Sequence, residues 1–381
     1  MEDMEEMEQL THRNKTRRVV CGGTPIGGGA PVSIQSMTNT ATEDIEATAA
    51  QILALYNSGA DIVRLAAPTI NAARGLAGIR ARVEAAGLRV PLVADIHFDY
   101  KIALEAIAAG ADKIRINPGN IGGPESLKAV IDAAGEAGIP IRIGVNSGSI
   151  EDDLKELFKE KPAEALAESA ARYIALVQGL GFYDIVVSIK SSNVLVNTEA
   201  HKLLSARTVV PLHIGITEAG FGEAAIVKSS VGIGLLLAMG IGDTIRVSLT
   251  GDPVREITAA RNILRAVDLL PGSISLISCP TCGRCRVDLA ALCEGVSAQL
   301  AALERERLDS VKQGRDIKPV TVALMGCAVN GPGEASHADL GIACGTEGGV
   351  YFEKGIKMDF VSYENIERRL IDGLRALSSP L

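Results

Sequence analysis

The sequence predicts an α/β protein in which a (β/α)8 TIM barrel is followed by a smaller α/β domain. Two observations lead to this prediction. Short β-branched runs alternate with alanine-rich, helix-like stretches over about the first 270 residues, and there are eight such runs. Six of the seven cysteines then follow residue 278, which marks the last third as a unit with its own chemistry. A length of 381 residues suits two domains, and a hydrophobic content of 47% is enough for both cores.

Each predicted strand ends in polar residues, and a helix-like stretch and a glycine-rich turn come after it. Repeated strand–helix units form a parallel sheet, and eight of them in about 250 residues are typical of a closed barrel. A doubly wound open sheet is the main alternative, but no G-x-G-x-x-G motif follows the first strand. The predicted strands cover residues 31–37, 61–67, 91–96, 113–117, 139–145, 183–190, 211–217 and 243–249.

The overall composition argues against several classes of protein. The formal net charge of −8 disfavours general nucleic-acid binding. The longest apolar run, residues 231–241, is interrupted by glycines, so we expect no membrane span. The acidic N-terminus lacks the basic-then-apolar pattern of a signal peptide, and we therefore expect a cytoplasmic enzyme.

The carboxyl ends of the predicted strands carry many polar side chains, and in a (β/α)8 barrel these ends form the mouth where the active site lies. Five of the side chains are cations, which need a counter-charge when they are buried together. Because arginine forms paired hydrogen bonds to phosphate oxygens, we expect a phosphorylated small molecule, with a diphosphate favoured. The alternative is that some of the cations pair with barrel acids. The residues at the mouth are Asn39, Arg64, Asp95, His97, Arg115, Asn117, Arg142, Asn146, Lys190, Ser191, Glu218, Arg246, Ser248 and Thr250.

The cysteine-rich segment allows several kinds of site. Cys279 and Cys282 form a Cys-x-x-Cys pair that brings two thiolates within reach of one metal. The third ligand could be Cys285, which extends the run as in bacterial ferredoxins, or Cys327, which ends a later strand-like run. A zinc site that adds Cys344, a redox dithiol and a [4Fe–4S] cluster with one non-thiolate ligand are the alternatives, and spacing favours the cluster.

Eight motifs together resemble a known family. The chain resembles the 4-hydroxy-3-methylbut-2-en-1-yl diphosphate synthases of the non-mevalonate isoprenoid pathway over nearly its whole length. A chance match to all of the motifs in order is negligible. They are PIGGGAPVSIQSMTNT (25–40), DIVRLAAPT (61–69), ADIHFDY (94–100), KIRINPGN (113–120), IRIGVNSGS (141–149), PLHIGITEAG (211–220), SCPTCGR (278–284) and GCAVNGPGEA (326–335).

This resemblance implies one [4Fe–4S] cluster per subunit, held by three cysteines and a glutamate. The matching residues are Cys279, Cys282, Cys327 and Glu334. It also implies that the substrate is 2-C-methyl-D-erythritol 2,4-cyclodiphosphate, whose ring is opened by two electrons and two protons with loss of water. The product is 4-hydroxy-3-methylbut-2-enyl diphosphate, and the electrons come from flavodoxin or ferredoxin.

The resemblance and the barrel pattern agree on the roles of residues at the mouth. We expect Glu218 to be the first choice as proton donor, with Asp95 and His97 as the other acids in reach, and Glu334 to move aside from the cluster during the reaction. We expect the substrate to be bound by Arg64, Arg115, Asn117, Arg142, Asn146, Lys190, Arg246 and Ser248.

The same resemblance divides the chain into segments. We expect a disordered or extended segment over 1–16, a dihydropteroate synthase-like barrel over 17–268 and a linker over 269–277. The remaining cluster domain, 278–381, is expected to resemble the iron–sulfur domains of sulfite and nitrite reductases. The short linker leaves no room for the inserted domain of plant-type members and favours a head-to-tail homodimer, in which one cluster domain caps the partner's barrel. A phosphate-binding iron–sulfur electron carrier or sensor is the alternative function.

Overall fold

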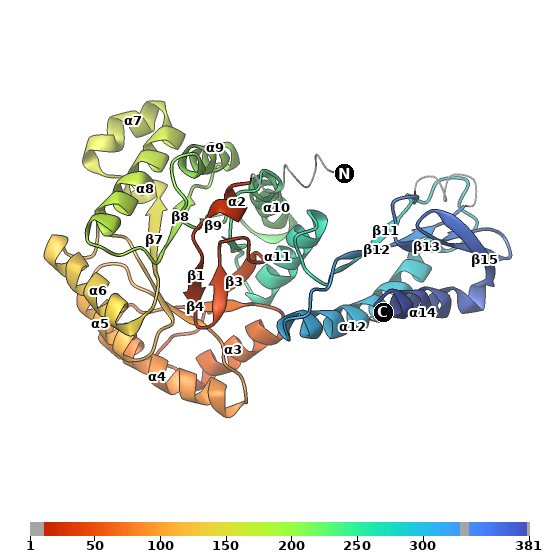
Figure 1. The fold of residues 1–381 in the computed structure, drawn as a ribbon, viewed down its shortest axis with the longest axis horizontal. Coiled ribbons are helices and arrows are strands. Elements are labelled where there is room, and N and C mark those ends of the chain that lie inside the picture. Colours follow the sequence, from red (N-terminus) through yellow and green to blue (C-terminus); the bar gives the residue numbers. More distant parts are fainter. Residues whose placement is uncertain (1–10, 328–334, 379–381) are drawn as a thin grey trace. The chain divides into compact units, whose positions relative to one another are not determined.

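The structure is a computed structural model that describes residues 11–327 and 335–378. The chain folds as two compact units, Met1–Val267 and Asp268–Leu381. Parallel strands form the centre of the first unit, and helices lie around them (Figure 1). The strands are β3 (Ser33–Met37), β4 (Ile62–Ala66), β5 (Leu92–Asp95), β6 (Lys113–Ile116), β7 (Ile141–Asn146), β8 (Ile185–Lys190), β9 (His213–Ile214) and β10 (Thr244–Ile245).

These eight strands form the predicted (β/α)8 barrel. Their order is β8-β7-β6-β5-β4-β3-β10-β9, and each neighbouring pair is parallel. A parallel bridge between Val187 of β8 and Leu212, just before β9, links the two ends of this order. All eight predicted strands are present, but β9 and β10 are only two residues long, whereas β7 and β8 each have six.

Four helices of the first unit, α3, α4, α5 and α9, begin where a side chain caps a free backbone N–H group. Asp44 accepts a hydrogen bond from Ala47 N at the start of α3, and Thr69 accepts one from Ala72 N at the start of α4. The helices that follow the strands are α3 (Ile45–Asn57), α4 (Ile70–Ala85), α5 (Tyr100–Ala108), α6 (Pro124–Ala137), α7 (Lys155–Glu160), α8 (Pro162–Gly179), α9 (Val194–Ser205), α10 (Gly222–Ala238) and α11 (Val254–Ala266).

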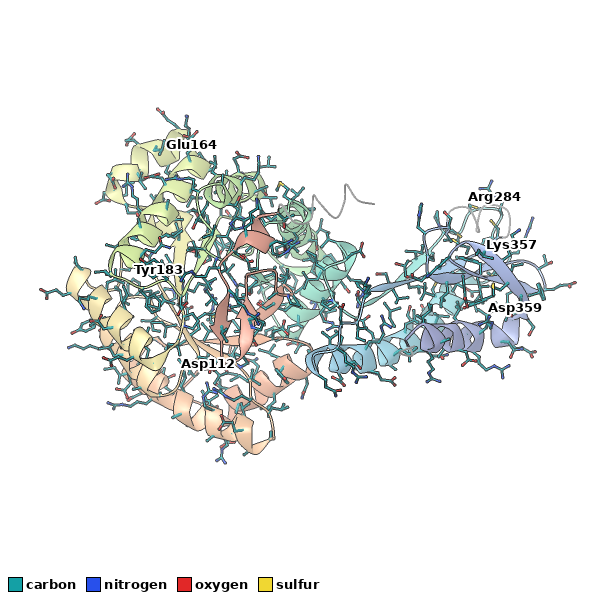
Figure 2. The ribbon with its side chains drawn as sticks, viewed as in Figure 1. Asp112, Glu164, Tyr183, Arg284, Lys357 and Asp359 are labelled. Atoms are coloured by element: carbon teal, nitrogen blue, oxygen red, sulfur yellow. The ribbon has the colours of Figure 1, made fainter. Side chains whose placement is uncertain are left out.

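The amino-terminal end of the barrel is closed by a short hairpin, β1 (Val19–Cys21) and β2 (Thr24–Ile26). Its buried Cys21 and Ile26 pack in one cluster with side chains from β4, β5 and β8. Nearby, the buried Asp112 accepts hydrogen bonds from Leu92 N (2.8 Å) and from Arg80 Nη2 (2.5 Å) (Figure 2). This end of the barrel is therefore closed by packed side chains, and the cavity described below lies at the carboxyl-terminal end of the strands.

The expectation of a disordered or extended segment over residues 1–16 is wrong for the part that the structure describes, residues 11–16. His12–Lys15 form one helical turn, α2. Arg13 N donates to Gly240 O (2.9 Å), and the buried Thr16 donates to Asp243 Oδ1 (2.8 Å). These contacts with residues just before β10 hold the segment against the barrel, and sequence patterns alone do not reveal such long-range contacts.

The second unit is a five-stranded sheet with two long helices packed against it, an α/β domain as predicted. The strand order is β11-β12-β13-β14-β15, in which the first three strands are parallel and the last two pairs are antiparallel. Asp359 of the last strand forms an ion pair with Arg369 of the second helix (3.1 Å; Figure 2). The elements are β11 (Ile274–Ser278), α12 (Leu289–Lys312), β12 (Val320–Met325), β13 (Leu340–Cys344), β14 (Gly348–Glu353), β15 (Ile356–Ser362) and α14 (Ile366–Ser378).

Most of strand β11 lies in the segment 269–277, which was predicted to be a linker. Its first residue, Ile274, is buried in the core of the second unit and pairs with Val320, so this part of the segment belongs to that unit. The likeness of this unit to sulfite and nitrite reductase domains stays a prediction. Within the described ranges, no helix is both long and apolar enough to cross a lipid bilayer.

Candidate active site

A cavity of about 240 Å³ opens at the carboxyl-terminal end of the barrel strands. Its lining side chains come from β4 to β10 or from the residues just after these strands, as the barrel prediction requires. Ser188 and Thr217 were not predicted. Ser188 stands two residues before Lys190 on β8, so the period of two along a strand could have found it. The lining residues are Arg64, Asp95, His97, Arg115, Arg142, Asn146, Ser188, Lys190, Thr217, Arg246 and Ser248.

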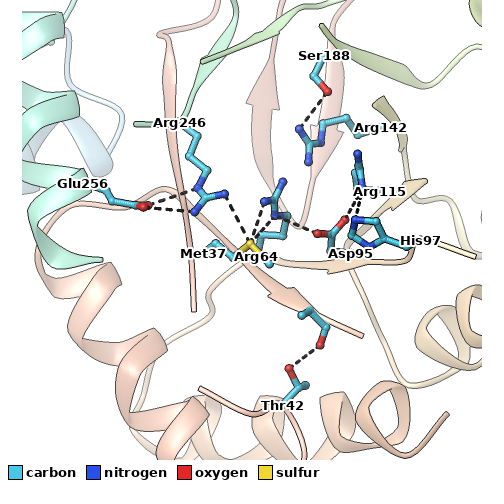
Figure 3. A network of polar contacts seen from close by, with 11 residues as sticks. Met37, Thr42, Arg64, Asp95, His97, Arg115, Arg142, Ser188, Arg246 and Glu256 are labelled. Atoms are coloured by element: carbon cyan, nitrogen blue, oxygen red, sulfur yellow. Dashed lines mark hydrogen bonds and ion pairs between the residues drawn. The ribbon is translucent and has the colours of Figure 1, made fainter. Parts of the chain in front are cut away.

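Asp95 lies between two of the cavity's arginines. Its carboxylate is 3.7 Å from Arg64 Nε and 3.2 Å from Arg115 Nη1, and all three side chains are buried (Figure 3). Burial alone would raise the pKa of Asp95, but Arg64 and Arg115 bring it down to about 2. Asp95 is therefore ionised and neutralises part of the arginine charge.

Arg246 is held by an acid from outside the strands. Its Nε and Nη2 atoms lie 3.4 and 3.3 Å from the two carboxylate oxygens of Glu256, in the first turn of α11. Met37 lies between this arginine and Arg64, whose Nε and Nη2 atoms are 3.0 and 2.9 Å from the Met37 sulfur (Figure 3). A thioether is a neutral and weak acceptor, so Met37 fixes Arg64 without neutralising it.

Arg142 and Lys190 have no acidic partner among the described residues. Arg142 Nη1 donates to Ser188 Oγ (3.2 Å), while its Nε and Nη2 atoms are buried and have no hydrogen-bond partner in the described part of the chain. Burial, together with Arg64 and other nearby arginines, lowers the pKa of Arg142 and of Lys190 well below their ordinary values. Both side chains lack the counter-charge that would make burial of their positive charge favourable.

The cavity therefore has an excess of positive charge. Five cations face or border it, and the two carboxylates Asp95 and Glu256 leave three of these charges uncompensated. The alternative that some of the cations pair with barrel acids holds for Arg64, Arg115 and Arg246, and the binding of a phosphorylated molecule stays a prediction.

The cysteines of the second unit gather at one end of its sheet. Cys279 directly follows β11, and Cys327 follows the neighbouring parallel strand β12. Gly326 N donates to Cys279 Sγ (3.2 Å), the kind of bond that stabilises a thiolate, and Cys282 is exposed. Cys285 packs against Gly326, and its thiol donates to Val287 O (3.3 Å). Over residues 11–327 and 335–378, no three His, Cys, Asp or Glu side chains converge in a geometry that would hold a metal ion.

Two family models match the chain. The GcpE TIM-barrel domain matches residues 16–261, and the GcpE protein C-terminal domain matches residues 275–376. The 4-hydroxy-3-methylbut-2-en-1-yl diphosphate synthase (flavodoxin) of Caldanaerobacter subterraneus subsp. tengcongensis is 50% identical over 359 residues, which cover 94% of this chain and 96% of that protein. The protein of the same name from Thermodesulfovibrio yellowstonii is 48% identical over 366 residues, which cover 96% of this chain and 100% of that protein.

This chain belongs to the 4-hydroxy-3-methylbut-2-en-1-yl diphosphate synthase family. The resemblance stated from the motifs is confirmed, and the chain is an oxidoreductase of this family. Among solved structures, a dihydropteroate synthase from Xanthomonas albilineans is 18% identical, with a TM-score of 0.48, and the match covers 67% of this chain and 100% of that one.

Most of the residues predicted for a synthase of this family line the cavity, but Asn117 and Glu218 are not among the lining residues. Asn117 is buried, and its Oδ1 atom accepts a hydrogen bond from Gly119 N (3.0 Å), so it shapes the loop after β6. Glu218 is exposed beyond β9, with φ at +51°. Glu334 lies outside the described residues.

The predicted acids of the synthase site differ in their surroundings. Asp95 lies beside two arginines that keep its carboxyl ionised, and its predicted role as an acid stays a prediction. His97 Nε2 lies 3.0 Å from Arg115 Nη1, which can only donate, so Nε2 is the acceptor and the ring proton is on Nδ1. Burial is the main cause that lowers the pKa of His97. Asp95 acts in the opposite direction and Arg115 adds to the lowering, so the neutral form of the ring is favoured.

Proposed function

We propose that this chain reduces 2-C-methyl-D-erythritol 2,4-cyclodiphosphate to 4-hydroxy-3-methylbut-2-enyl diphosphate, with the barrel cavity as the diphosphate site. The observation that supports this most directly is the pair Arg142 and Lys190, which are buried and have no acid beside them in the described chain. A ligand with several anionic oxygens would supply the missing hydrogen bonds and counter-charge.

The charge of the cavity suits a diphosphate in particular. A cyclic diphosphate carries two negative charges, one on each phosphorus, and opening its ring at a carbon–oxygen bond leaves a terminal phosphate with one more. The cavity has three uncompensated positive charges. The site therefore favours the charge that develops as the ring opens, which is the property that lowers a reaction barrier.

The electrons for this reduction would come from a [4Fe–4S] cluster. Cys279, Cys282 and Cys327 would hold it together with Glu334, and when bound it supplies single electrons to the substrate. Cysteine-rich composition at the ends of two neighbouring strands fits this donor set, and the N–H bond to Cys279 fits a thiolate ligand. Flavodoxin is the proposed electron donor, since the curated relatives carry it in their names; ferredoxin is the other candidate.

The departing oxygen must also receive a proton to leave as water. We propose Glu218 as the donor at the departing oxygen, because it follows β9 at the barrel mouth and is exposed there. His97 is the second candidate, through its Nδ1–H, since its Nε2 faces Arg115. Asp95 is assigned to charge compensation instead.

The test of the diphosphate site is direct. Arg142→Met and Lys190→Met should each abolish turnover of the cyclic diphosphate in anaerobic assays with dithionite and a viologen. Arg172→Met is the matched control, because this exposed arginine of α8 pairs with Asp153 and Glu168 and is not among the lining residues of the cavity. If cluster-loaded wild-type protein shows no turnover, the function is wrong and a phosphate-binding electron carrier or sensor is favoured.

We further propose that the active form is a head-to-tail homodimer, in which the cluster of one subunit serves the barrel of the other. This proposal is supported by the location of the two groups that must cooperate. The anion cavity belongs to the first compact unit of the chain, and the cysteines that would hold the cluster belong to the second. A Cys327→Ala subunit mixed with a Glu218→Ala subunit should recover activity that neither variant has alone. Confirmed mixed dimers that stay inactive would reject the shared site.

A further inference from the structure

Glu256 is a buried acid that the reaction does not use directly. It is 3% exposed and lies in the first turn of α11, on the outside of the barrel wall, yet it is surrounded by groups from β3 and from the residues around β10. A carboxylate in such a place is unfavourable unless it is fully paired. Its partners therefore show what it does.

The two oxygens of Glu256 accept four hydrogen bonds. Oε2 accepts from Ser36 Oγ (3.0 Å) on β3 and from Arg246 Nε (3.4 Å). Oε1 accepts from Arg246 Nη2 (3.3 Å) and from Leu249 N (3.0 Å). One side chain thus joins a neighbouring strand, a cavity arginine and the backbone beyond that arginine. Figure 3 shows its contact with the arginine.

The backbone contact is important because β10 is so short. The strand ends at Ile245. Arg246 N still donates to Ile214 O of β9 (3.0 Å), and the residues after Arg246 are no longer part of the regular hydrogen-bonded sheet. Ser248, a lining residue of the cavity, lies in this stretch. The bond from Leu249 N to Glu256 replaces the strand pairing that is missing there, and so it fixes the path of the segment that carries Ser248.

We propose that Glu256 is a positioning residue for the diphosphate site, one that sets the direction of the Arg246 guanidinium and the place of Ser248. This inference rests on the proposed function and adds a residue to that site. Glu256 occupies Nε and Nη2 of Arg246, and the only acceptor that the described residues place near Nη1 is the Met37 sulfur at 3.7 Å. The guanidinium is therefore oriented by a carboxylate on one side, while Nη1 stays available to an anionic oxygen.

A buried ion pair that serves stability alone is the competing explanation. The two explanations differ in one respect. Glu256→Gln keeps an oxygen that can accept from Leu249 N, so this variant mainly changes the contact with Arg246. If Glu256 acts through Arg246, the effect of Glu256→Gln on anion binding must vanish once Arg246 is gone, whereas an effect on stability alone would leave anion affinity unchanged.

The experiment is a double-mutant cycle on the anaerobically prepared, cluster-loaded full chain, with inorganic pyrophosphate as the probe and calorimetry as the readout. We expect Arg246→Gln to weaken pyrophosphate binding about tenfold, because it removes a cation that faces the anion, and Glu256→Gln to weaken it to a similar degree. Glu256 fixes the guanidinium of Arg246 through two hydrogen bonds, whereas Asp95 accepts one from Arg115, so in Glu256→Gln the loss of orientation outweighs the positive charge that the substitution adds to the cavity. The double variant should bind within about twofold of Arg246→Gln alone. The matched control is Glu223→Gln, which removes an exposed acid from the first turn of α10. The electron paramagnetic resonance signal of the reduced cluster should be the same in all variants.

Two results would overturn the inference on its own: wild-type affinity in Glu256→Gln, or losses that multiply in the double variant. If Glu256→Gln does not fold, Ser36→Ala takes its place, since it removes only the bond to Oε2. We expect it to weaken binding about threefold, and unchanged affinity there counts against the inference. If the wild-type chain itself binds no pyrophosphate, the proposed diphosphate site is rejected, and this inference with it.

Discussion

Replacing Asp95 with asparagine should make the protein less stable and its cavity a stronger anion binder. The pKa of Asp95 is about 2, compared with an ordinary value of 3.8, because Arg64 and Arg115 outweigh the effect of burial. That difference corresponds to about 2 kcal/mol of stability at neutral pH. The same substitution raises the uncompensated positive charge of the cavity from three to four, which favours a diphosphate.

The pH dependence gives this prediction its sign. A carboxylate whose pKa is lowered by folding stabilises the protein above its unfolded pKa, and the contribution disappears as the pH falls toward the folded value. We therefore expect Asp95→Asn to lower the free energy of unfolding by about 2 kcal/mol at neutral pH, and by clearly less near pH 3. Urea unfolding of the barrel at both pH values, followed by circular dichroism, measures the difference.

The matched control is Glu105→Gln, which breaks an exposed ion pair with Arg74 (3.0 Å). It should change the free energy of unfolding by less than about 1 kcal/mol. Pyrophosphate titrations of the same proteins should show tighter binding only in Asp95→Asn. Equal losses of stability at both pH values, or weaker pyrophosphate binding, would refute the assignment of Asp95 as a counter-ion to the two arginines.

Three further substitutions probe other parts of the barrel. A Cβ atom on Gly144 would lie 2.5 Å from Arg115 Nε, so Gly144→Ala should push this flexible side chain aside and weaken pyrophosphate binding about tenfold in calorimetry, with folding retained. Burial raises the pKa of Asp243 to about 6, against its hydrogen bond from Leu212 N, so the wild-type protein should lose stability as the pH rises from about 4 to 6. Asp243→Asn should flatten that slope in urea unfolding, and an unchanged slope would contradict the assignment. Gly135→Ala, in the last turn of α6 with no atom within 4 Å of the new Cβ, should raise the free energy of unfolding by about 0.5 kcal/mol and leave pyrophosphate binding unchanged.

The strands and most of the cavity could be predicted from the sequence because they depend on local periodicity. A strand alternates its side chains, so polar residues within a buried strand, such as Arg142 near the start of β7 and Lys190 at the end of β8, are expected to face the barrel interior. Glu256 could not be found this way, because it reaches the site from a helix and its role depends on contacts with β3 and β10.

Two residues that were predicted for the site do not line the cavity. Asn117 and Glu218 follow strands in the sequence, yet each belongs to a loop whose backbone path decides where the side chain goes. Asn117 turns back to Gly119 N, and the positive φ of Glu218 redirects the chain after β9. Strand periodicity ends at the last strand residue, so it carries no information about these two positions.

Because β9 and β10 are short, the backbone pairing that holds the barrel wall together is less extensive there than between β7 and β8. Strands β7 and β8 pair through six residues, whereas β9 and β10 pair through two, and the chain beyond them is held by side chains instead. Local opening should therefore need least free energy around residues 215–218 and 246–250, where backbone amides should exchange with deuterium sooner than those of β7. An anion bound to Arg246 and Lys190 would link these two parts of the wall, and the slowest-exchanging region should then extend around the whole barrel.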